Sequence, residues 1–298
     1  MKAIVISKLL EAIDELEVDQ NAPEPELKEN QVLIEIKASA LNYFDILQSQ
    51  ERYQIKPSLP FILGSEFAGV IIAVHPTVNN KYKPGDKIFG YGQGSFAERI
   101  AIDIQAILLI PDGMSFEEAS GLFITCPTSY TALVIRAKLQ KDEWCLVHAA
   151  AGGVGIAAVQ IAKALGAKVI ATCGSNDKLA FAKKFGADYG VNYNDKDWQK
   201  QVLQITGKRG VDVVFDPVGL VQASLKFIAW SGRILVVGFA GIGNSFEKLF
   251  AEKKLKPVIY KNVYHGLHNV KYGLKAIANR ETYGKVVVIP NVGRDSKI

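Results

Sequence analysis

The feature that most limits how this chain can fold is a run of glycines and alanines between a strand-like and a helix-like segment. The apolar stretch 144–148 precedes it, the amphipathic stretch 154–165 follows it, and the run reads Ala149-Ala150-Ala151-Gly152-Gly153-Val154-Gly155. This order matches the dinucleotide-binding fingerprint G-x-G-x-x-G, with alanine in the first glycine position. We therefore expect the start of the helix to bind a pyrophosphate through the backbone of Gly152, Gly153, Val154 and Gly155.

The elements expected after this turn support that interpretation. A tight strand–helix turn without a cofactor would also need small residues, so the glycines alone do not decide the matter. Apolar and amphipathic stretches predict further strands and helices in alternation, with strands at 168–173, 189–193, 212–216 and 233–239 and helices at 176–185 and 198–206. Such alternation predicts a parallel, doubly wound sheet of the Rossmann kind.

The first third of the chain has a different pattern. Residues 32–38 alternate between apolar and polar side chains, the period of a half-buried strand, and shorter strands are expected at 69–74, 87–89 and 97–102. Many short strands without repeated helices favour a barrel-like β domain. The helix-like stretch 116–130 leads from this domain into the Rossmann part.

The end of the second Rossmann strand predicts which cofactor binds. NAD-specific sheets carry Asp or Glu there, to bond the ribose 2′-hydroxyl. Here the strand ends in Cys173-Gly174, so the acidic position is empty, and Asp177 is expected in the first turn of the next helix. Ser175 can donate a hydrogen bond to a 2′-phosphate and Lys178 can supply a positive charge. These residues predict NADPH.

Composition excludes several classes of function. Hydrophobic residues make up 49% and charged residues 22%, which fits an ordinary globular protein, and no apolar run reaches the length of a membrane span. The net charge of +5 is spread along the chain, which argues against nucleic-acid binding. Three scattered cysteines indicate reduced thiols and a cytoplasmic protein. The final Ser296-Lys297-Ile298 differs from a peroxisomal address in one side chain, so the peroxisome is the alternative.

Several motifs together resemble the zeta-crystallin and quinone oxidoreductase branch of the medium-chain dehydrogenase/reductase superfamily. Besides the glycine turn, they are Ala40-Leu41-Asn42-Tyr43-x-Asp45, Leu63-Gly64-Ser65-Glu66-Phe67-Ala68-Gly69, Lys83-Pro84-Gly85-Asp86, Asp216-Pro217-Val218-Gly219 and Gly284-Lys285-Val286-Val287. The resemblance implies an α/β fold of two domains. A GroES-like β-barrel catalytic domain would comprise residues 1–122 and 256–298, and an NADP-binding Rossmann domain would comprise residues 123–255.

The resemblance also bears on the chemistry. Zinc-dependent members of the superfamily carry Cys where Asn42 stands and His where Ser65 stands, and neither residue present here is a usual zinc ligand. Without a Lewis acid, hydride transfer needs an acceptor that is already electrophilic. The resemblance implies a quinone. The alternatives are a 2-alkenal or enoyl-thioester reductase, and a cofactor-binding protein with little catalysis that binds RNA or serves a structural role.

The remaining site residues follow from the resemblance rather than from spacing. It implies that Thr128 and Phe239-Ala240-Gly241 lie near the nicotinamide and that Tyr193 lies near the adenine. The substrate cleft would be lined by Asn42, Tyr43, Asp45 and Tyr53. No residue is singled out as a general acid.

One departure from the family concerns assembly. After Gly241 the chain lacks a strand and most of a helix that the family carries, and Ser245–Lys254 resembles only the end of that helix. In relatives, the missing strand pairs across a dimer axis. We therefore expect a shortened Rossmann domain, weakened activity, and a monomer or weak dimer.

Overall fold

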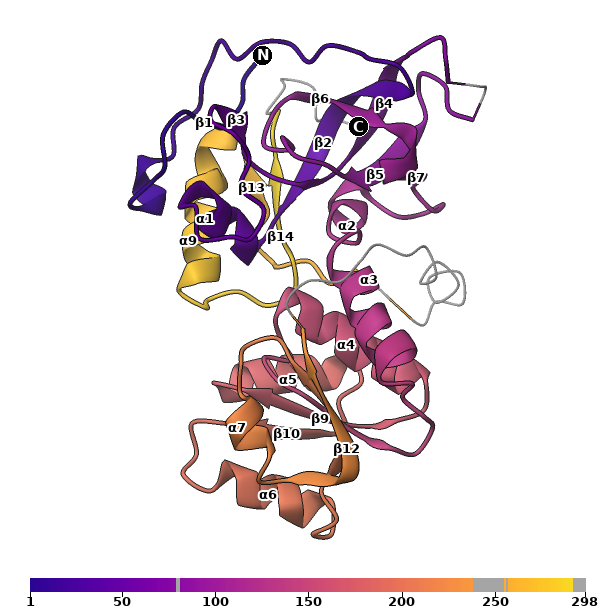
Figure 1. Cartoon of the computed structure of the whole chain (residues 1–298), viewed down its shortest axis with the longest axis vertical. Coiled ribbons are helices and arrows are strands. Elements are labelled where there is room, and N and C mark those ends of the chain that lie inside the picture. The colour runs from indigo at the N-terminus through magenta and orange to yellow at the C-terminus, as the bar shows by residue number, and fades with distance from the viewer. Residues whose placement is uncertain (79–80, 238–254, 256, 292–298) are drawn as a thin grey trace. The chain divides into compact units, whose positions relative to one another are not determined.

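The computed structural model describes residues 1–78, 81–237, 255 and 257–291. The chain divides into two compact units (Figure 1): unit 1 comprises Met1–Phe123 and Ile259–Ile298, and unit 2 comprises Ile124–Val258. Unit 1 is therefore built from two separate stretches of chain and unit 2 from one. The domain boundaries expected from the sequence, after residue 122 and before residue 256, lie one and three residues earlier.

Unit 1 contains a seven-stranded sheet in the order β13-β14-β2-β4-β5-β7, with β6 also paired to β2. The period of two in β2 buries Val32, Ile34 and Ile36, which pack with Phe67 in one core cluster. The β-rich first domain is confirmed, and strands from the C-terminal stretch complete it. The strands are β2 (Gln31–Leu41), β4 (Glu66–Val74), β5 (Lys87–Tyr91), β6 (Arg99–Asp103), β7 (Ile107–Leu109), β13 (Tyr264–His265) and β14 (Val286–Ile289), and β1 (Val5–Ile6) pairs with β3 (Phe61–Ile62) separately.

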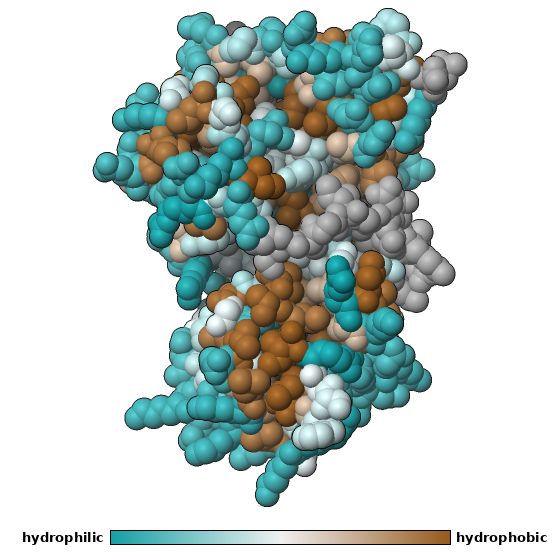
Figure 2. Space-filling view, viewed as in Figure 1, coloured by the Kyte–Doolittle hydropathy of each residue, from teal (hydrophilic) through white to brown (hydrophobic). Residues whose placement is uncertain are grey.

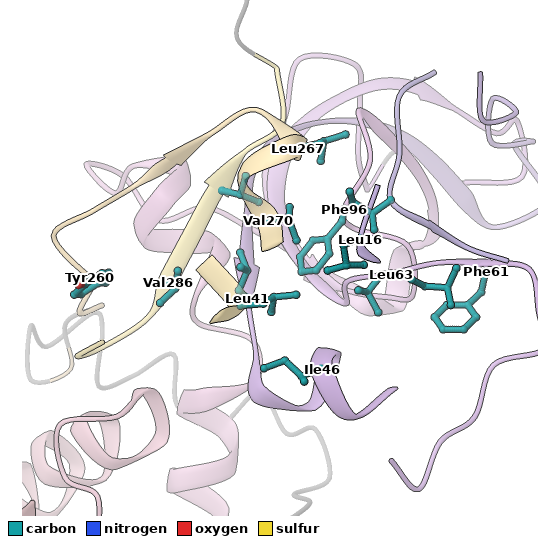
Figure 3. Close-up of a cluster of buried hydrophobic side chains, with 14 residues drawn as sticks. Leu16, Leu41, Ile46, Phe61, Leu63, Phe96, Tyr260, Leu267, Val270 and Val286 are labelled. Carbon is teal, nitrogen blue, oxygen red and sulfur yellow. The ribbon is translucent and has the colours of Figure 1, made fainter. Parts of the chain in front are cut away.

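A second buried cluster holds the two stretches of unit 1 together (Figure 3). Leu41 at the end of β2 and Ile46 in α1 (Tyr43–Ser49) belong to the N-terminal stretch. They share this core with Val270 of α9 (Val270–Ala278) and Val286 of β14. Each buried side chain of this size contributes roughly 1.5–3 kcal/mol. The N-terminal and C-terminal stretches therefore depend on each other for stability.

Unit 2 contains a fully parallel sheet in the order β10-β9-β8-β11-β12, which confirms the predicted Rossmann sheet. The chain first adds strands on one side of β8 and then on the other, so the order reverses between β8 and β11. Ligands of such sheets bind outside the carboxyl ends of the strands at this switch point. The strands are β8 (Trp144–Val147), β9 (Lys168–Cys173), β10 (Tyr189–Asn192), β11 (Val211–Asp216) and β12 (Ile228–Val236), and the helices are α4 (Gly153–Ala164), α5 (Asn176–Lys184), α6 (Trp198–Ile205) and α7 (Val221–Ser224).

The prediction of one continuous helix over 116–130 is wrong. The structure has α2 (Phe116–Ser120), which ends at Gly121, and a separate α3 (Thr125–Tyr130) that continues as a π-helix over Thr131–Arg136. Pro127 explains the restart, because it is the third residue of α3, where its missing N–H removes no intrahelical hydrogen bond.

The last predicted strand also begins earlier than expected. β12 starts at Ile228 rather than at residue 233, and its pairing with β11 shifts register between Val211 and Val213. A bulge of this kind adds residues to one strand without ending the ladder. It accommodates Trp230, whose side chain is 98% exposed.

Several expectations concern residues outside the described part of the chain. They are the nicotinamide contacts of Phe239, Ala240 and Gly241, the shortened segment after Gly241, and the terminal Ser296-Lys297-Ile298. Within the described ranges, none of the helices has both the length and the apolar character that a bilayer crossing requires.

His148, directly after β8, is a buried polar residue of the unit 2 core. Its Nδ1 lies 2.7 Å from Thr172 Oγ1 and its Nε2 lies 3.0 Å from Ser224 Oγ. The rings of Trp198 and Phe227 meet it edge to face. Burial lowers the pKa of this imidazole from 6.5 to about 4, against the opposing influence of the Asp216 carboxyl group.

This low pKa predicts a loss of stability in acid. Between about pH 6.5 and 4 the unfolded chain binds a proton that the folded chain does not, so the free energy of unfolding should fall as the pH falls through this window. All three tryptophans lie in unit 2, so denaturant unfolding followed by fluorescence reports on this unit. His148→Asn should be less stable overall and should vary less over the same window. Equal pH dependence in both proteins would assign the effect to another group.

Candidate functional site

The turn after β8 lies at the switch point of the unit 2 sheet. Gly152 is the N-cap of α4, and the helix begins at Gly153. A Cβ atom at Gly155 would lie 2.3 Å from the carbonyl oxygen of Ala149, so only glycine allows α4 to pass this close to the turn. A Cβ atom at Gly152 would meet only the same oxygen, at 3.3 Å. The space beside Gly152 is therefore open to a ligand.

The start of α4 has the properties of a phosphate site. In a helix the first N–H groups have no intrahelical partner and carry a partial positive charge. In α4 these groups belong to Gly153, Val154 and Gly155, the residues expected to bind the pyrophosphate. The first turn of α4 holds no acidic side chain that would repel a phosphate. These residues fit the pyrophosphate of a dinucleotide.

The ends of β9 and β10 bring together the residues expected around the adenosine half of the cofactor. Ser175 caps α5, and its Oγ accepts a hydrogen bond of 3.4 Å from the N–H of Lys178. A Cβ atom at Gly174 would lie 2.9 Å from the Tyr193 hydroxyl, so Gly174 keeps room for that ring. Asn194, which sequence reasoning missed, donates from Nδ2 to the Gly174 carbonyl oxygen at 2.8 Å.

Two charged residues, Asp177 and Lys178, lie at this edge of the sheet. Asp177 is exposed in the first turn of α5. Burial raises the pKa of the Cys173 thiol, while the nearby Lys178 charge acts in the opposite direction, so Lys178 lies close to the end of β9. A cation and a hydroxyl group beside an empty acidic position fit a 2′-phosphate.

Thr128 lies on α3, which packs against α4. The neighbouring Ser129 donates from Oγ to the carbonyl oxygen of Val154 at 2.8 Å, and this bond fixes α3 to the first turn of α4. Thr128 is half-buried beside it. The structure therefore places Thr128 on an element fixed to the phosphate-binding turn.

Asp216, at the end of β11, is a further residue that sequence reasoning did not select. Its Oδ1 accepts hydrogen bonds from the N–H groups of Val218 at 3.0 Å and Gly219 at 2.8 Å. Its Oδ2 is buried and accepts no bond from the described residues. Asp216 thus shapes the turn at the carboxyl edge of the sheet, beside the switch point.

In unit 1, Asn42 and Asp45 meet where β2 gives way to α1. The Asn42 N–H donates to Asp45 Oδ2 at 2.6 Å, in the reciprocal pattern that starts many helices. Asp45 is fully buried and Asn42 is 8% exposed. The structure therefore brings these two expected cleft residues together.

Glu66 and Lys285 complete this cluster. Lys285 Nζ lies 2.7 Å from Glu66 Oε2 and also donates to Asn42 Oδ1. Asn42 Nδ2 donates to the same Glu66 oxygen at 3.1 Å. Two serines hold the Glu66 backbone: Ser95 Oγ accepts from its N–H and Ser39 Oγ donates to its carbonyl oxygen.

The expected tyrosines differ in their surroundings. Tyr43 is 58% exposed and takes no part in the buried cluster. Tyr53 stacks on Phe44 with ring centroids 5.1 Å apart, and Tyr91 stands opposite Glu66 in the β4–β5 ladder. Burial, then Tyr91 and Asp45, raise the pKa of Tyr53 to about 12. Burial, then Asp45 and Glu66, also raise the pKa of Tyr91.

Sequence reasoning missed Glu66, Lys285 and Tyr91 as site residues. A signal for the first two existed, because each is a charged residue beside an apolar strand, Glu66 at the start of β4 and Lys285 just before β14. They are far apart in the chain, so a single sequence cannot pair them. Tyr91 carries no such signal.

The cluster differs from a zinc site. Asn42 bonds an ammonium and a carboxylate, and Ser65 is buried with a 2% exposed surface. No group of three or more potential metal-ligating side chains occurs within the described ranges. Asn and Ser are not usual zinc ligands, so the residues present do not fit a zinc site.

Comparison with protein families agrees with the two units. Residues 28–112 match a family described as "Alcohol dehydrogenase GroES-like domain", and residues 153–265 match one described as "Zinc-binding dehydrogenase". The second match excludes positions 42 and 65, so it concerns the cofactor-binding part and says nothing about zinc ligands in this chain.

Quinone oxidoreductase-like protein 2 of Rattus norvegicus is a relative by sequence. It is 36% identical over 230 residues, which cover 76% of this chain and 65% of the rat protein. The matched part is thus slightly less than two thirds of the length of that relative.

Three solved structures resemble the whole chain. A probable oxidoreductase from Mycobacterium abscessus is 32% identical with a TM-score of 0.87, over 97% of this chain and 99% of the other. Escherichia coli quinone oxidoreductase complexed with NADPH is 27% identical with a TM-score of 0.86, over 97% and 100%. CurK enoyl reductase is 26% identical with a TM-score of 0.85, over 97% and 99%.

The two glycines of the turn should respond differently to substitution. Gly155→Ala forces a methyl group against the Ala149 carbonyl oxygen and should lower the free energy of unfolding of unit 2 by about 1–3 kcal/mol. Gly152→Ala is the matched control, and it should cost less than about 1 kcal/mol but weaken NADPH binding. Denaturant unfolding followed by fluorescence and an NADPH titration measure the two effects. Equal losses of stability would contradict the close approach at Gly155.

Proposed function

Because the chain belongs to the zinc-free, quinone oxidoreductase-like branch of the medium-chain dehydrogenase/reductase superfamily, we propose that it reduces a quinone with NADPH. This proposal rests on the hydrogen bonds of Asn42, whose side-chain amide is already bonded to Glu66 and Lys285. With no zinc ligand at this position or at Ser65, the acceptor must be electrophilic without a Lewis acid. A quinone meets that requirement.

The bound NADPH supplies the hydride. The first turn of α4 binds its pyrophosphate, and the space beside Gly152 admits the phosphate oxygens. Ser175 and Lys178 would bind the 2′-phosphate, and Thr128 would contact the nicotinamide half. These residues orient the cofactor and take no part in bond changes.

Residues of unit 1 interact with the acceptor. Lys285 is already paired with the Glu66 carboxylate, so hydrogen-bond donors rather than this ammonium must meet the negative charge that develops on the acceptor oxygen. Tyr53 and Tyr91 are protonated at neutral pH, since tyrosine ordinarily titrates near pH 10 and both pKa values are raised from there, so each can donate a hydrogen bond. Asn42 and Asp45 hold the end of β2 and the start of α1 in place.

The second candidate is a 2-alkenal or enoyl-thioester reductase. The likeness to CurK enoyl reductase favours it, because that enzyme matches over nearly the whole length of both chains. An enone shares the electrophilic character of a quinone and would suit the same unit 1 residues. A cofactor-binding protein with little catalysis is the remaining alternative.

An acceptor panel tests these candidates. NADPH oxidation is followed with quinones, 2-alkenals and enoyl thioesters, with and without prior treatment with a metal chelator. We expect the highest kcat/KM with a quinone and no effect of the chelator. A preference for an enoyl thioester would support the second candidate. NADPH binding without turnover of any acceptor would support the third. Loss of activity on chelator treatment, together with one bound zinc per chain, would refute the zinc-free mechanism.

Lys178 should decide the choice of cofactor. Lys178→Ala removes the cation beside Ser175 and should weaken NADPH binding by about 1.5–3 kcal/mol while leaving NADH binding nearly unchanged. Lys184→Ala, an exposed lysine at the other end of α5, is the matched control and should change neither affinity. Fluorescence titrations with both cofactors measure this. Equal weakening for NADPH and NADH would place Lys178 outside the 2′-phosphate site.

For assembly we propose a monomer or weak dimer. Within the described part of the chain, β12 pairs only with β11, and Val236 on β12 is 70% exposed. Apolar side chains also gather on the face of unit 2 that carries α7 and β12, where Leu225 is 55% exposed (Figure 2). Light scattering over a range of concentrations should give the monomer mass at low concentration. A tight dimer that Val236→Lys dissociates would show instead that β12 is a dimer edge.

For the compartment we propose the cytoplasm. All three cysteines are free and buried, the state that a reducing environment preserves.

A further inference from the structure

The buried cluster of unit 1 contains one negative charge more than it can balance. Lys285 and Glu66 form an ion pair at 2.7 Å, so their charges cancel. Asp45 is also fully buried, yet its carboxyl group accepts only the Asn42 N–H. An ionised carboxyl group buried without a counter-charge is costly, and a bound proton removes that cost.

One buried oxygen of this carboxyl group has no donor. Asp45 Oδ1 is buried and has no hydrogen-bond partner among the described residues. An ionised carboxylate would leave a charged oxygen unsatisfied there, whereas a protonated carboxyl group carries no charge. The missing donor and the missing counter-charge therefore both favour a protonated Asp45.

We propose that Asp45 is held as a neutral carboxylic acid at neutral pH and stores the proton that the reduced acceptor takes up. This inference rests on the proposed function and names a residue for the proton transfer that quinone reduction requires. Asp45 does not touch the acceptor in this scheme, so it acts as a positioning and proton-storing residue.

The surroundings of Asp45 agree with this assignment. Burial raises the pKa of Asp45, the Asn42 hydrogen bond and Lys285 oppose this rise, Glu66 adds to it, and the net pKa is about 8. Tyr53 and Tyr91 are the other titratable groups on which its charge acts. On α9, which packs against α1, the titratable side chains are Lys271, Tyr272 and Lys275, the last paired with Asp14.

The proton balance of the reaction is simple. A hydride brings two electrons and one proton to the quinone, and one oxygen of the product then needs a second proton. The half-buried hydroxyl of Tyr53 or Tyr91 gives its proton to that oxygen, and the O–H bond of Asp45 breaks to restore the tyrosine. The Asp45 carboxylate then regains a proton from water before the next turnover.

Infrared spectroscopy of the whole chain tests the stored proton directly. At about pH 6 the wild-type spectrum minus that of Asp45→Asn should show the C=O stretch of a protonated carboxyl group, which disappears as the pH rises through about 8. Asp112→Asn, at an exposed aspartate, should retain the band. Superimposable spectra of wild type and Asp45→Asn in this region would overturn the proposal.

A pH series of the wild-type chain alone covers the case in which Asp45→Asn does not fold. An acid band that persists to neutral pH supports the stored proton. Complete loss of acid bands below about pH 5, where ordinary carboxyl groups ionise, overturns it.

Kinetics test the use of the proton. Asp45→Asn should lower kcat for quinone reduction roughly 100-fold with little change in KM, and the alkaline decline of the wild-type kcat near pH 8 should vanish. Asp112→Asn should keep the wild-type kcat. An Asp45→Asn variant with wild-type kcat overturns the proposal even if the infrared band is present.

The same measurements separate this proposal from the proposed function. If the wild-type chain turns over no acceptor of the panel, the proposed function is wrong and the proton store is wrong with it. Turnover without an acid band from Asp45 overturns the proton store alone.

Discussion

The ammonium of Lys285 is the group on which unit 1 depends. It balances the buried Glu66 carboxylate at 2.7 Å and also binds Asn42 Oδ1, so it joins the start of β14 to β4 and to the end of β2. Removing one partner of such a buried ion pair typically lowers the free energy of unfolding by roughly 3–5 kcal/mol. The same contacts determine which way the Asn42 amide faces, with its oxygen toward Lys285 and its nitrogen toward Glu66. One cation thus serves the fold and the candidate site together.

Unit 2 depends on a steric constraint instead of a charge. The closeness of α4 to the turn after β8 requires the missing side chain of Gly155, and the Ser129 hydroxyl then fixes α3 to that helix. This arrangement leaves the first N–H groups of α4 facing the switch point of the sheet. The two candidate sites therefore differ in kind, since backbone groups form one and buried side chains form the other.

Local patterns predicted most of the fold, and they did so for physical reasons. Strand β9 and the Gly152–Gly155 turn follow from apolar runs and glycine spacing within a few residues, which one sequence displays. The break before Pro127 and the early start of β12 were missed, because they depend on helix ends and on strand register rather than on hydropathy. The site shows the same division. Asn42 and Asp45 were expected because they stand in one short motif that resembles the family, whereas the contacts of Lys285 reach across the chain.

Unit 1 consists of two separate stretches of chain, so its two parts leave the ribosome at different times. Unit 2 is continuous, so its whole sequence is available before the chain ends, and domains generally fold as units in the order in which they emerge. Glu66 emerges early, but the ammonium that balances it follows on the order of tens of seconds later at ordinary elongation rates. During that interval the strands of the N-terminal stretch lack the Lys285 ammonium that balances Glu66. Their hydrophobic core also lacks Val286. The nascent chain at this stage is a substrate for chaperones, and a premature stop before residue 285 leaves unit 1 unable to complete its fold.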